Sequence, residues 1–178
     1  GDGSKTKEIS RNHKIMFSDS GLVTMIGGKW TTFRRMAQDL VDKSERHFNL
    51  SATHSVTPTM KIHGHTEYKD LNDSMYVYGS DKEKIMQIAV NEPEYNTYID
   101  EELRIHAAQV VWAVRKEMAR TIEDVLARRT RCLLLDARQS IIIAPKVAAI
   151  MAKELGKDEQ WQKKQIEDYT HTAQNYIL

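Results

Sequence analysis

Two short apolar runs near the N-terminal end of the chain predict a β-hairpin. His13–Phe17 carries Ile-Met-Phe, and Leu22–Ile26 reads Leu-Val-Thr-Met-Ile. The segment between them, Ser18–Gly21, has the small polar residues and the glycine that are typical of a tight turn.

The second run ends abruptly at Gly27 and Gly28, and a helical pattern follows. From Thr31 to about His47 the apolar residues recur at helical spacing, and Thr31 or Thr32 can cap the helix. The order strand, glycine turn, helix is therefore predicted. The stretch Asn49–Asp73 reads as loop with one short strand at Met60–Ile62.

The remainder of the chain is predicted to be helical. Ser80 is expected to cap a short helix over Asp81–Val90, with Glu83 completing a capping box and Pro93 ending the element. Four further helices are expected. The first runs from Leu103 to about Met118, and the second begins after a Thr121 cap, with Asp124 at its third position. The third runs from an Asp136 cap through Pro145 to Leu155, with Gly156 as its stop, and the last runs from Asp158 to about Tyr176.

The expected fold class is thus mainly α. A C-terminal helical domain over residues 100–178 is preceded by the hairpin, the GGK turn and the helix in residues 1–50, with a linker and its short helix over 51–99.

Composition narrows the function classes. The 178 residues are 40% hydrophobic and 29% charged, which is typical of a globular chain. The net charge of +1 favours neither nucleic acid nor an anionic membrane as a partner. Cys132, the single cysteine, excludes an intramolecular disulfide and reads as a buried thiol. No signal peptide is visible, and the longest apolar stretch, Ile141–Met151, is too short to span a bilayer, so a cytoplasmic location is expected.

The segment Gly27-Gly28-Lys29-Trp30-Thr31-Thr32 is the strongest local signal for chemistry. Two glycines allow a sharp turn and close approach of a ligand, while the following helix start and Lys29 favour a negative or electron-rich group. An ordinary tight turn with a solvated lysine is the alternative. The segment is not a P-loop, because Trp30 stands where that motif needs Ser or Thr.

Three other groups of residues could carry chemistry. Arg11 would add a second cation if the hairpin placed it beside Lys29, and two cations would suit a phosphate or a carboxylate. Arg128–Arg131 is locally basic, but these arginines are expected to pair with Glu117, Asp124 and Asp136 or to contact another domain. His63 and His65, with His54 as a third candidate, could bind metal, although loop histidines without that role are the alternative.

Two long segments carry a resemblance to a known family. Leu22–Asp39, LVTMIGGKWTTFRRMAQD, resembles the C-terminal flavin-contacting segment of FAD-dependent glycerol-3-phosphate dehydrogenases, and Ser10–His13 resembles the Ser-Arg-acid stretch just before it, with Asn12 in place of the acid. Val111–Arg131, VWAVRKEMARTIEDVLARRTR, and Leu135–Arg138 resemble that family's C-terminal helical domain. The likeness spans nearly the whole chain and is weakest over Asn49–Asp73.

The resemblance implies that the chain is the C-terminal third of an enzyme, with a hairpin and helix left over from an α/β flavin-binding domain. It implies FAD as cofactor, oxidation of sn-glycerol 3-phosphate to dihydroxyacetone phosphate and a quinone as electron acceptor. Gly27, Gly28, Lys29, Trp30, Thr31 and Thr32 would contact the flavin, and Arg11 and Lys29 would bind the substrate. The family's general base and ADP-binding residues are not in the printed sequence, so the fragment alone is expected to be inactive.

Two alternatives stay open at this point. A free-standing helical interaction module would need no cofactor, and a related flavin amine oxidase would share the flavin but lacks such a helical domain. Peripheral contact with the inner face of the cytoplasmic membrane and assembly into a homo-oligomer are left open by the sequence.

Overall fold

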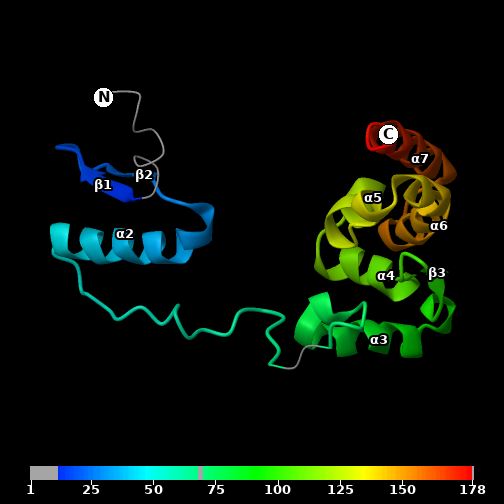
Figure 1. Ribbon diagram of the computed structural model, residues 1–178, viewed down its shortest axis with the longest axis horizontal. Coiled ribbons are helices and arrows are strands. Elements are labelled where there is room, and N and C mark those ends of the chain that lie inside the picture. The colour runs from blue at the N-terminus through cyan, green and yellow to red at the C-terminus, as the bar shows by residue number, and fades with distance from the viewer. Residues whose placement is uncertain (1–11, 68–69, 178) are drawn as a thin grey trace. The chain divides into compact units, whose positions relative to one another are not determined.

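A computed structural model of the chain describes residues 12–67 and 70–177. The chain forms two compact units that divide between Ile62 and His63 (Figure 1). This division differs from the expected linker over 51–99, since residues after Ile62 belong to the helical unit. Met75, Ile85 and Ala89 explain the difference, because all three are buried in a cluster with Trp112.

The first unit contains the predicted hairpin and helix. Strand β1 (His13–Phe17) pairs antiparallel with β2 (Val23–Gly27), with Ile15 opposite Met25. A short 3₁₀ turn η2 (Trp30–Thr32) leads into helix α2 (Phe33–His47). Thr32 stands at the N-cap position of α2, but its side chain makes no cap hydrogen bond to that helix. The expected strand at Met60–Ile62 is absent, and this segment lies in an irregular stretch.

The hairpin packs on α2 through contacts at both ends of β1. At one end the Phe17 ring stacks on His47, with centroids 4.0 Å apart, and Phe48 meets it edge-on at 5.9 Å. At the other end His13 Nε2 lies 3.0 Å from an Asp39 carboxylate oxygen. No side chain in residues 12–62 is buried, so the described part of this unit has no core of its own.

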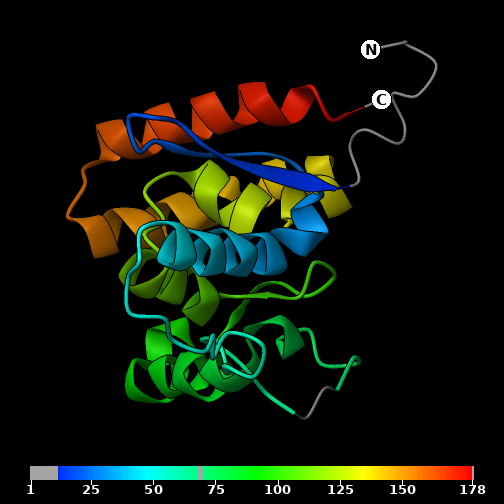
Figure 2. The same cartoon turned by 90° about the vertical axis from the view of Figure 1, so that its left-hand side faces the viewer.

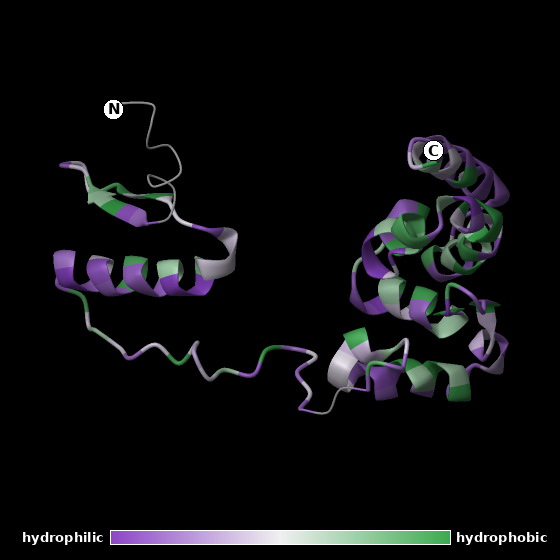
Figure 3. Ribbon diagram, viewed as in Figure 1, coloured by the Kyte–Doolittle hydropathy of each residue, from purple (hydrophilic) through white to green (hydrophobic). Residues whose placement is uncertain are grey.

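The second unit is a helical assembly built around α4 (Ala107–Lys116). Every residue of α4 from Ala107 to Val114 is buried, because α3 (Lys82–Asn91) covers one side and α6 (Ala137–Leu155) the other. Figure 3 shows hydrophobic residues concentrated on these central helices. Ala108 and Trp112 face the α3 side, whereas Val110 and Val114 belong to the main core.

The start of α4 differs from the predicted helix at Leu103. Tyr98–Asp100 forms strand β3, which pairs with β4 (Ile105–His106) and holds the chain extended up to Ala107. His106 then caps α4, since its Nδ1 accepts a hydrogen bond from Ala108 N at 3.2 Å. The helix ends at Lys116, two residues before the expected end at Met118, which adopts a left-handed backbone and is 77% exposed.

The short helix before α4 also begins differently from expectation. A 3₁₀ segment, η3 (Tyr76–Asp81), precedes α3, and Asp81 rather than Ser80 stands at its N-cap position. The predicted box between Ser80 and Glu83 is not formed, because Ser80 lies within η3 and its N–H donates to the Gly64 carbonyl oxygen at 3.2 Å. The Asp81 carboxylate pairs with Lys84 and His63 and makes no cap hydrogen bond. The element ends at Asn91, just before η4 (Pro93–Tyr95).

The predicted capping box at Thr121 is confirmed. Thr121 Oγ1 accepts from Asp124 N at 3.1 Å, while Asp124 Oδ2 accepts from Thr121 N at 3.0 Å. The turn that follows, η5 (Asp124–Arg129), is a π-helix, and a short helix α5 (Cys132–Leu135) comes after it. Burial raises the pKa of the Cys132 thiol.

The last two helices form an antiparallel pair (Figure 2). The predicted caps hold α6, with Asp136 accepting from Gln139 N at 2.9 Å and Gly156 ending the helix at φ +62°. Helix α7 (Glu159–Gln174) begins at the predicted Asp158 cap. The buried Tyr169 hydroxyl donates to Ser140 Oγ at 2.8 Å and joins α7 to α6. Among the described residues, no helix has both the length and the hydrophobicity needed to traverse a bilayer.

Arg115 joins three elements of the helical unit through two bidentate ion pairs. From α4 its guanidinium binds Glu92 at 2.6 and 2.9 Å and Glu154 of α6 at 2.6 and 2.8 Å. The guanidinium lowers the pKa of Glu92 below its usual value. Paired charges of this geometry stabilise the fold only while the carboxylates are ionised.

We expect Arg115→Met to lower the melting temperature at pH 7 by roughly 2–6 °C, because Glu154 is left with little solvent and no cation. Arg115→Lys restores part of the loss, since it keeps the charge without the planar fork. Because the folded pKa of Glu92 is lowered, the contribution is present above the ordinary value of 4.5 and is lost as the pH falls through the folded pKa. Calorimetry at several pH values measures the shift. Lys164→Met, which removes an exposed pair on α7, is the control, and an equal loss in both variants would contradict the assignment.

Candidate functional site

The predicted glycine turn joins the end of β2 to the start of η2. Gly27 and Gly28 have φ values of +79° and +85°, in the left-handed region that favours glycine. A Cβ on Gly27 would lie 2.7 Å from the Asn12 carbonyl oxygen, and a Cβ on Gly28 would collide with the Met36 sulfur. Gly27 is therefore required by the close approach of the Asn12 backbone, and Gly28 chiefly by its positive φ, because the Met36 side chain above it is flexible.

Lys29 lies at the exposed corner of this turn. Its backbone is extended, and Thr32 closes the turn by donating from N and from Oγ1 to the Lys29 carbonyl oxygen, each at 2.9 Å. Within the described part of the chain, no carboxylate forms an ion pair with Lys29. The two hydrogen bonds from Thr32 stabilise the turn, and the Lys29 ammonium group remains available to a ligand.

Two large aromatic rings lie exposed beside Lys29. Trp30 is 87% exposed and Phe33 is 62% exposed, and their rings are partly stacked with centroids 5.8 Å apart. Neither η2 nor α2 carries an acidic residue in its first turn. Peptide N–H groups at a helix start carry partial positive charge, so the segment presents donors, one cation and an aromatic surface. An anionic or electron-rich planar group suits such a surface.

His13 supports this turn, and the sequence did not single it out for that role. Its Nε2 lies 3.0 Å from Asp39 Oδ2, while Arg35 Nε lies 3.1 Å from Asp39 Oδ1. Asp39 thus ties β1 to α2, and His13 lies close to the turn, since a Cβ on Gly28 would lie 3.5 Å from His13 Cβ. The spacing of Arg35 and Asp39, one helical turn apart, could have indicated their pair within α2, whereas no local pattern indicates the contact with His13.

The other predicted residues fall in several places. Arg11 lies outside the described residues. Gly27, Gly28, Lys29, Trp30, Thr31 and Thr32 form one continuous exposed turn, of which only Gly28 is partly covered. Their roles toward a flavin or a substrate remain predictions.

The histidines do not come together as a metal site. His63 pairs with Asp81, and His54 belongs to the first unit. Over the described ranges, no three His, Cys, Asp or Glu side chains are grouped as metal ligands would be.

Two of the three arginines in residues 128–131, Arg128 and Arg129, are held by local partners. Arg128 binds Glu123 at 2.7 Å and Asp124 at 3.3 Å, and Arg129 donates to the Glu117 carbonyl oxygen at 2.6 Å. Asp124 is therefore a partner as predicted. Asp136 instead caps α6, and Glu117 is reached through its backbone.

Comparison with known proteins identifies the family that the chain resembles. A family model described as the C-terminal domain of alpha-glycerophosphate oxidase matches residues 20–162. The chain is similar to a probable mitochondrial glycerol-3-phosphate dehydrogenase of Dictyostelium discoideum, with 31% identity over 99% of the chain and 30% of that protein. Mitochondrial glycerol-3-phosphate dehydrogenase of Rattus norvegicus is 31% identical over 93% of the chain, and a probable one of Caenorhabditis elegans is 33% identical over 91%.

The names of these relatives correct the expected location, and their lengths show how much of such a protein the chain covers. Their names place them in mitochondria, which contradicts the cytoplasmic location expected from the lack of a visible signal peptide. The chain spans between a quarter and a third of the length of these curated relatives. The match with the family model covers both the glycine turn and most of the helical unit, and the chain belongs to the family described as the C-terminal domain of alpha-glycerophosphate oxidase.

Proposed function

We propose that the chain is the C-terminal part of an FAD-dependent dehydrogenase that oxidises sn-glycerol 3-phosphate to dihydroxyacetone phosphate. The observation that carries the proposal is the exposed Gly27–Thr32 turn, with its donors and unpaired cation, in a chain of this family. The names of the relatives supply the substrate. A quinone as acceptor and a mitochondrial location complete the proposal.

The donors of the turn fit the electron-rich edge of a flavin. FAD, when bound, supplies a two-electron acceptor for the alcohol carbon of the substrate. Gly27 and Gly28 would let the backbone approach a flat ring closely, and the peptide N–H groups near Trp30 and Thr31 would supply partial positive charge to it. Lys29 stabilises negative charge that develops there during the reaction.

Substrate binding is proposed for Arg11 and Lys29. Both are cations, and a phosphate group is well matched to a bidentate guanidinium together with an ammonium group. Arg11 precedes β1 in the sequence, only two residues before His13. Thr32 acts as a positioning residue, because its hydroxyl fixes the Lys29 carbonyl and therefore the direction of the turn.

The exposed apolar side chains of the first unit favour this proposal over a free-standing interaction module. Ile26, Trp30 and Phe33 are each more than half exposed, and residues 12–62 contain no buried side chain. A two-stranded hairpin with one helix is marginal in water on its own. Such a unit gains stability from a larger sheet, which the rest of a flavin-binding domain supplies.

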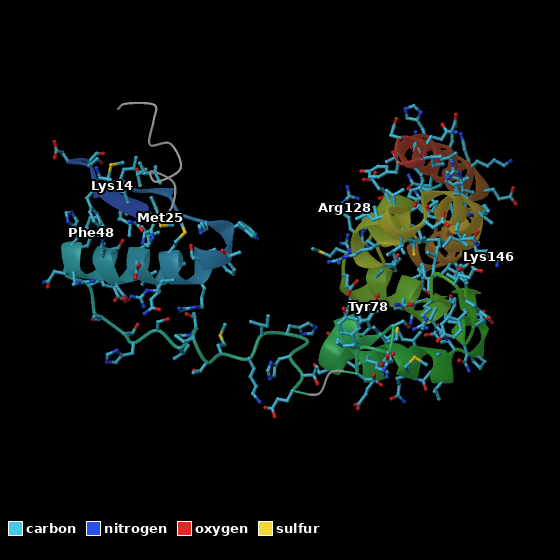
Figure 4. The ribbon with its side chains drawn as sticks, in the orientation of Figure 1. Lys14, Met25, Phe48, Tyr78, Arg128 and Lys146 are labelled. Atoms are coloured by element: carbon cyan, nitrogen blue, oxygen red, sulfur yellow. The ribbon has the colours of Figure 1, made fainter. Side chains whose placement is uncertain are left out.

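In the full-length enzyme, Lys29→Ala should lower kcat by about one to two orders of magnitude, the range for loss of one donor to developing charge. FAD content should change little, because the charge that Lys29 stabilises on the flavin appears only during reduction. The KM for glycerol 3-phosphate should rise, because Lys29 is also proposed to bind the phosphate group. Steady-state kinetics and flavin absorbance measure both. Lys14→Ala removes another exposed lysine of the same hairpin (Figure 4) and should leave kcat unchanged. Unchanged turnover in the Lys29 variant would assign it to the solvated surface.

The 178-residue chain alone should neither retain FAD nor oxidise glycerol 3-phosphate. The Gly27–Thr32 turn contributes a few hydrogen bonds of about 0.5–1.5 kcal/mol each, which cannot offset the immobilisation of a large ligand. The purified chain should be colourless, and added FAD should leave its melting temperature unchanged. A flavin absorbance band that elutes with the chain in gel filtration would contradict this prediction.

A further inference from the structure

The carboxylate of Asp39 connects the first strand of the hairpin to helix α2, along which the hairpin lies (Figure 1). Asp39 Oδ2 lies 3.0 Å from His13 Nε2 in β1, and Asp39 Oδ1 lies 3.1 Å from Arg35 Nε in α2. An ionised carboxylate only accepts hydrogen bonds, so His13 Nε2 is the donor. The side chains of His13 and Asp39 are 22% and 24% exposed, against 63% for Arg35. The contact between the two elements is therefore better shielded from water than the pair within α2.

His13 stands at the open end of the hairpin, where both segments of the proposed substrate site begin. In the antiparallel register His13 lies opposite Gly27. Arg11 comes two residues before His13 in the sequence, and Lys29 comes two residues after Gly27. The His13–Gly27 pair thus sets the two points of the backbone from which the segments with the proposed cations depart.

The backbone at this end of the hairpin is closely packed. A Cβ on Gly27 would lie 2.7 Å from the Asn12 carbonyl oxygen, and a Cβ on Gly28 would lie 3.5 Å from His13 Cβ. The start of β1 and the glycine turn therefore lie side by side with little space between them. A shift of His13 relative to α2 has to be followed by the turn.

A second contact joins the hairpin to α2 at the other end of β1. There the Phe17 ring stacks on His47 with centroids 4.0 Å apart, and Phe48 meets Phe17 edge-on at 5.9 Å. Phe17 lies four residues beyond His13 in an extended strand, which corresponds to about 13 Å. Of these two contacts, the polar one lies beside the glycine turn, and the aromatic one gives a matched comparison for it.

We propose that Asp39 is a positioning residue for the reaction and acts through His13. The Asp39 carboxylate fixes the His13 ring, and the ring fixes where β1 begins relative to α2. The Arg11 and Lys29 segments are thereby held at the spacing that one phosphate group needs. Misplacement of binding groups by about 1 Å can lower a rate by roughly 100-fold. The inference rests on the proposed function, because the substrate roles of Arg11 and Lys29 belong to it.

Turnover of the full-length enzyme, expressed per bound FAD, tests the assignment. Asp39→Leu keeps a side chain of similar shape without an acceptor, and should lower kcat by about tenfold and raise the KM for glycerol 3-phosphate. FAD content should be unchanged, because the glycine turn supplies only a few of the contacts that retain a large cofactor. His47→Leu removes the aromatic stacking at the other end of β1 and should leave both kinetic constants unchanged.

Two substitutions of His13 separate its hydrogen bond from the packing of its ring. His13→Gln can place an amide nitrogen near the position of Nε2 and donate to Asp39, so it should retain most of the wild-type turnover. His13→Leu has no donor and should match Asp39→Leu. The double variant with leucine at both positions should be no worse than either single variant, because the two side chains act through one contact.

Hydrogen exchange of the full-length protein, read by mass spectrometry, measures the turn independently of turnover. In Asp39→Leu, a peptide covering residues 24–32 should exchange faster than in the wild type, whereas a peptide covering residues 43–50 should be unchanged. His47→Leu should give the reverse pattern, because it loosens the other end of the hairpin.

Four results would overturn the proposal. They are normal turnover per bound FAD in Asp39→Leu, equal turnover in His13→Gln and His13→Leu, an equal rise of exchange in both peptides of Asp39→Leu, and loss of FAD with normal turnover of the flavin that remains. The last would give Asp39 a structural role alone. Normal turnover in Asp39→Leu beside impaired turnover in Lys29→Ala rejects only the positioning role, whereas normal turnover in both rejects the role of the glycine turn in the proposed function.

Discussion

The helical unit depends on the burial of α4 from both sides. Each fully buried valine or isoleucine contributes about 1.5–3 kcal/mol through removal of apolar surface from water, and α4 supplies Val110, Val111 and Val114. Because α3 packs on Ala108 and Trp112 while α6 packs on the opposite face, α4 fixes the position of both helices. Arg115, at the solvent end of α4, then joins Glu92 and Glu154 into the same arrangement.

The two units differ in how they satisfy their apolar groups. The helical unit buries them, whereas the hairpin and α2 leave Ile26, Trp30 and Phe33 exposed around the glycine turn. Exposed aromatic and aliphatic side chains of this kind are typical of a surface that contacts something larger. The proposed flavin site therefore lies on the unit whose described residues form no core.

Sequence reasoning succeeded where a local interaction decides the structure. The Thr121–Asp124 box, the Asp136 and Asp158 caps and the Gly156 stop each involve residues within one turn of one another. It failed where a distant partner decides. The Ser80 N–H donates to the Gly64 carbonyl oxygen, so the box at Ser80 does not form. Pairing of β3 with β4 delays α4 to Ala107. The glycine turn was found from its spacing, but its roles came from the family resemblance, since no contact within the turn names a ligand.

The claim that stability resides in the helical unit is tested most directly by hydrogen exchange of the 178-residue chain. Amides of Val110–Val114 lie in a helix that is buried on all sides, whereas Val23–Ile26 lie in a hairpin with no buried side chain. The account predicts that the α4 amides exchange only through global unfolding of their unit, many orders of magnitude more slowly than those of β2. Equal protection of the two segments, or slower exchange in β2, would contradict it.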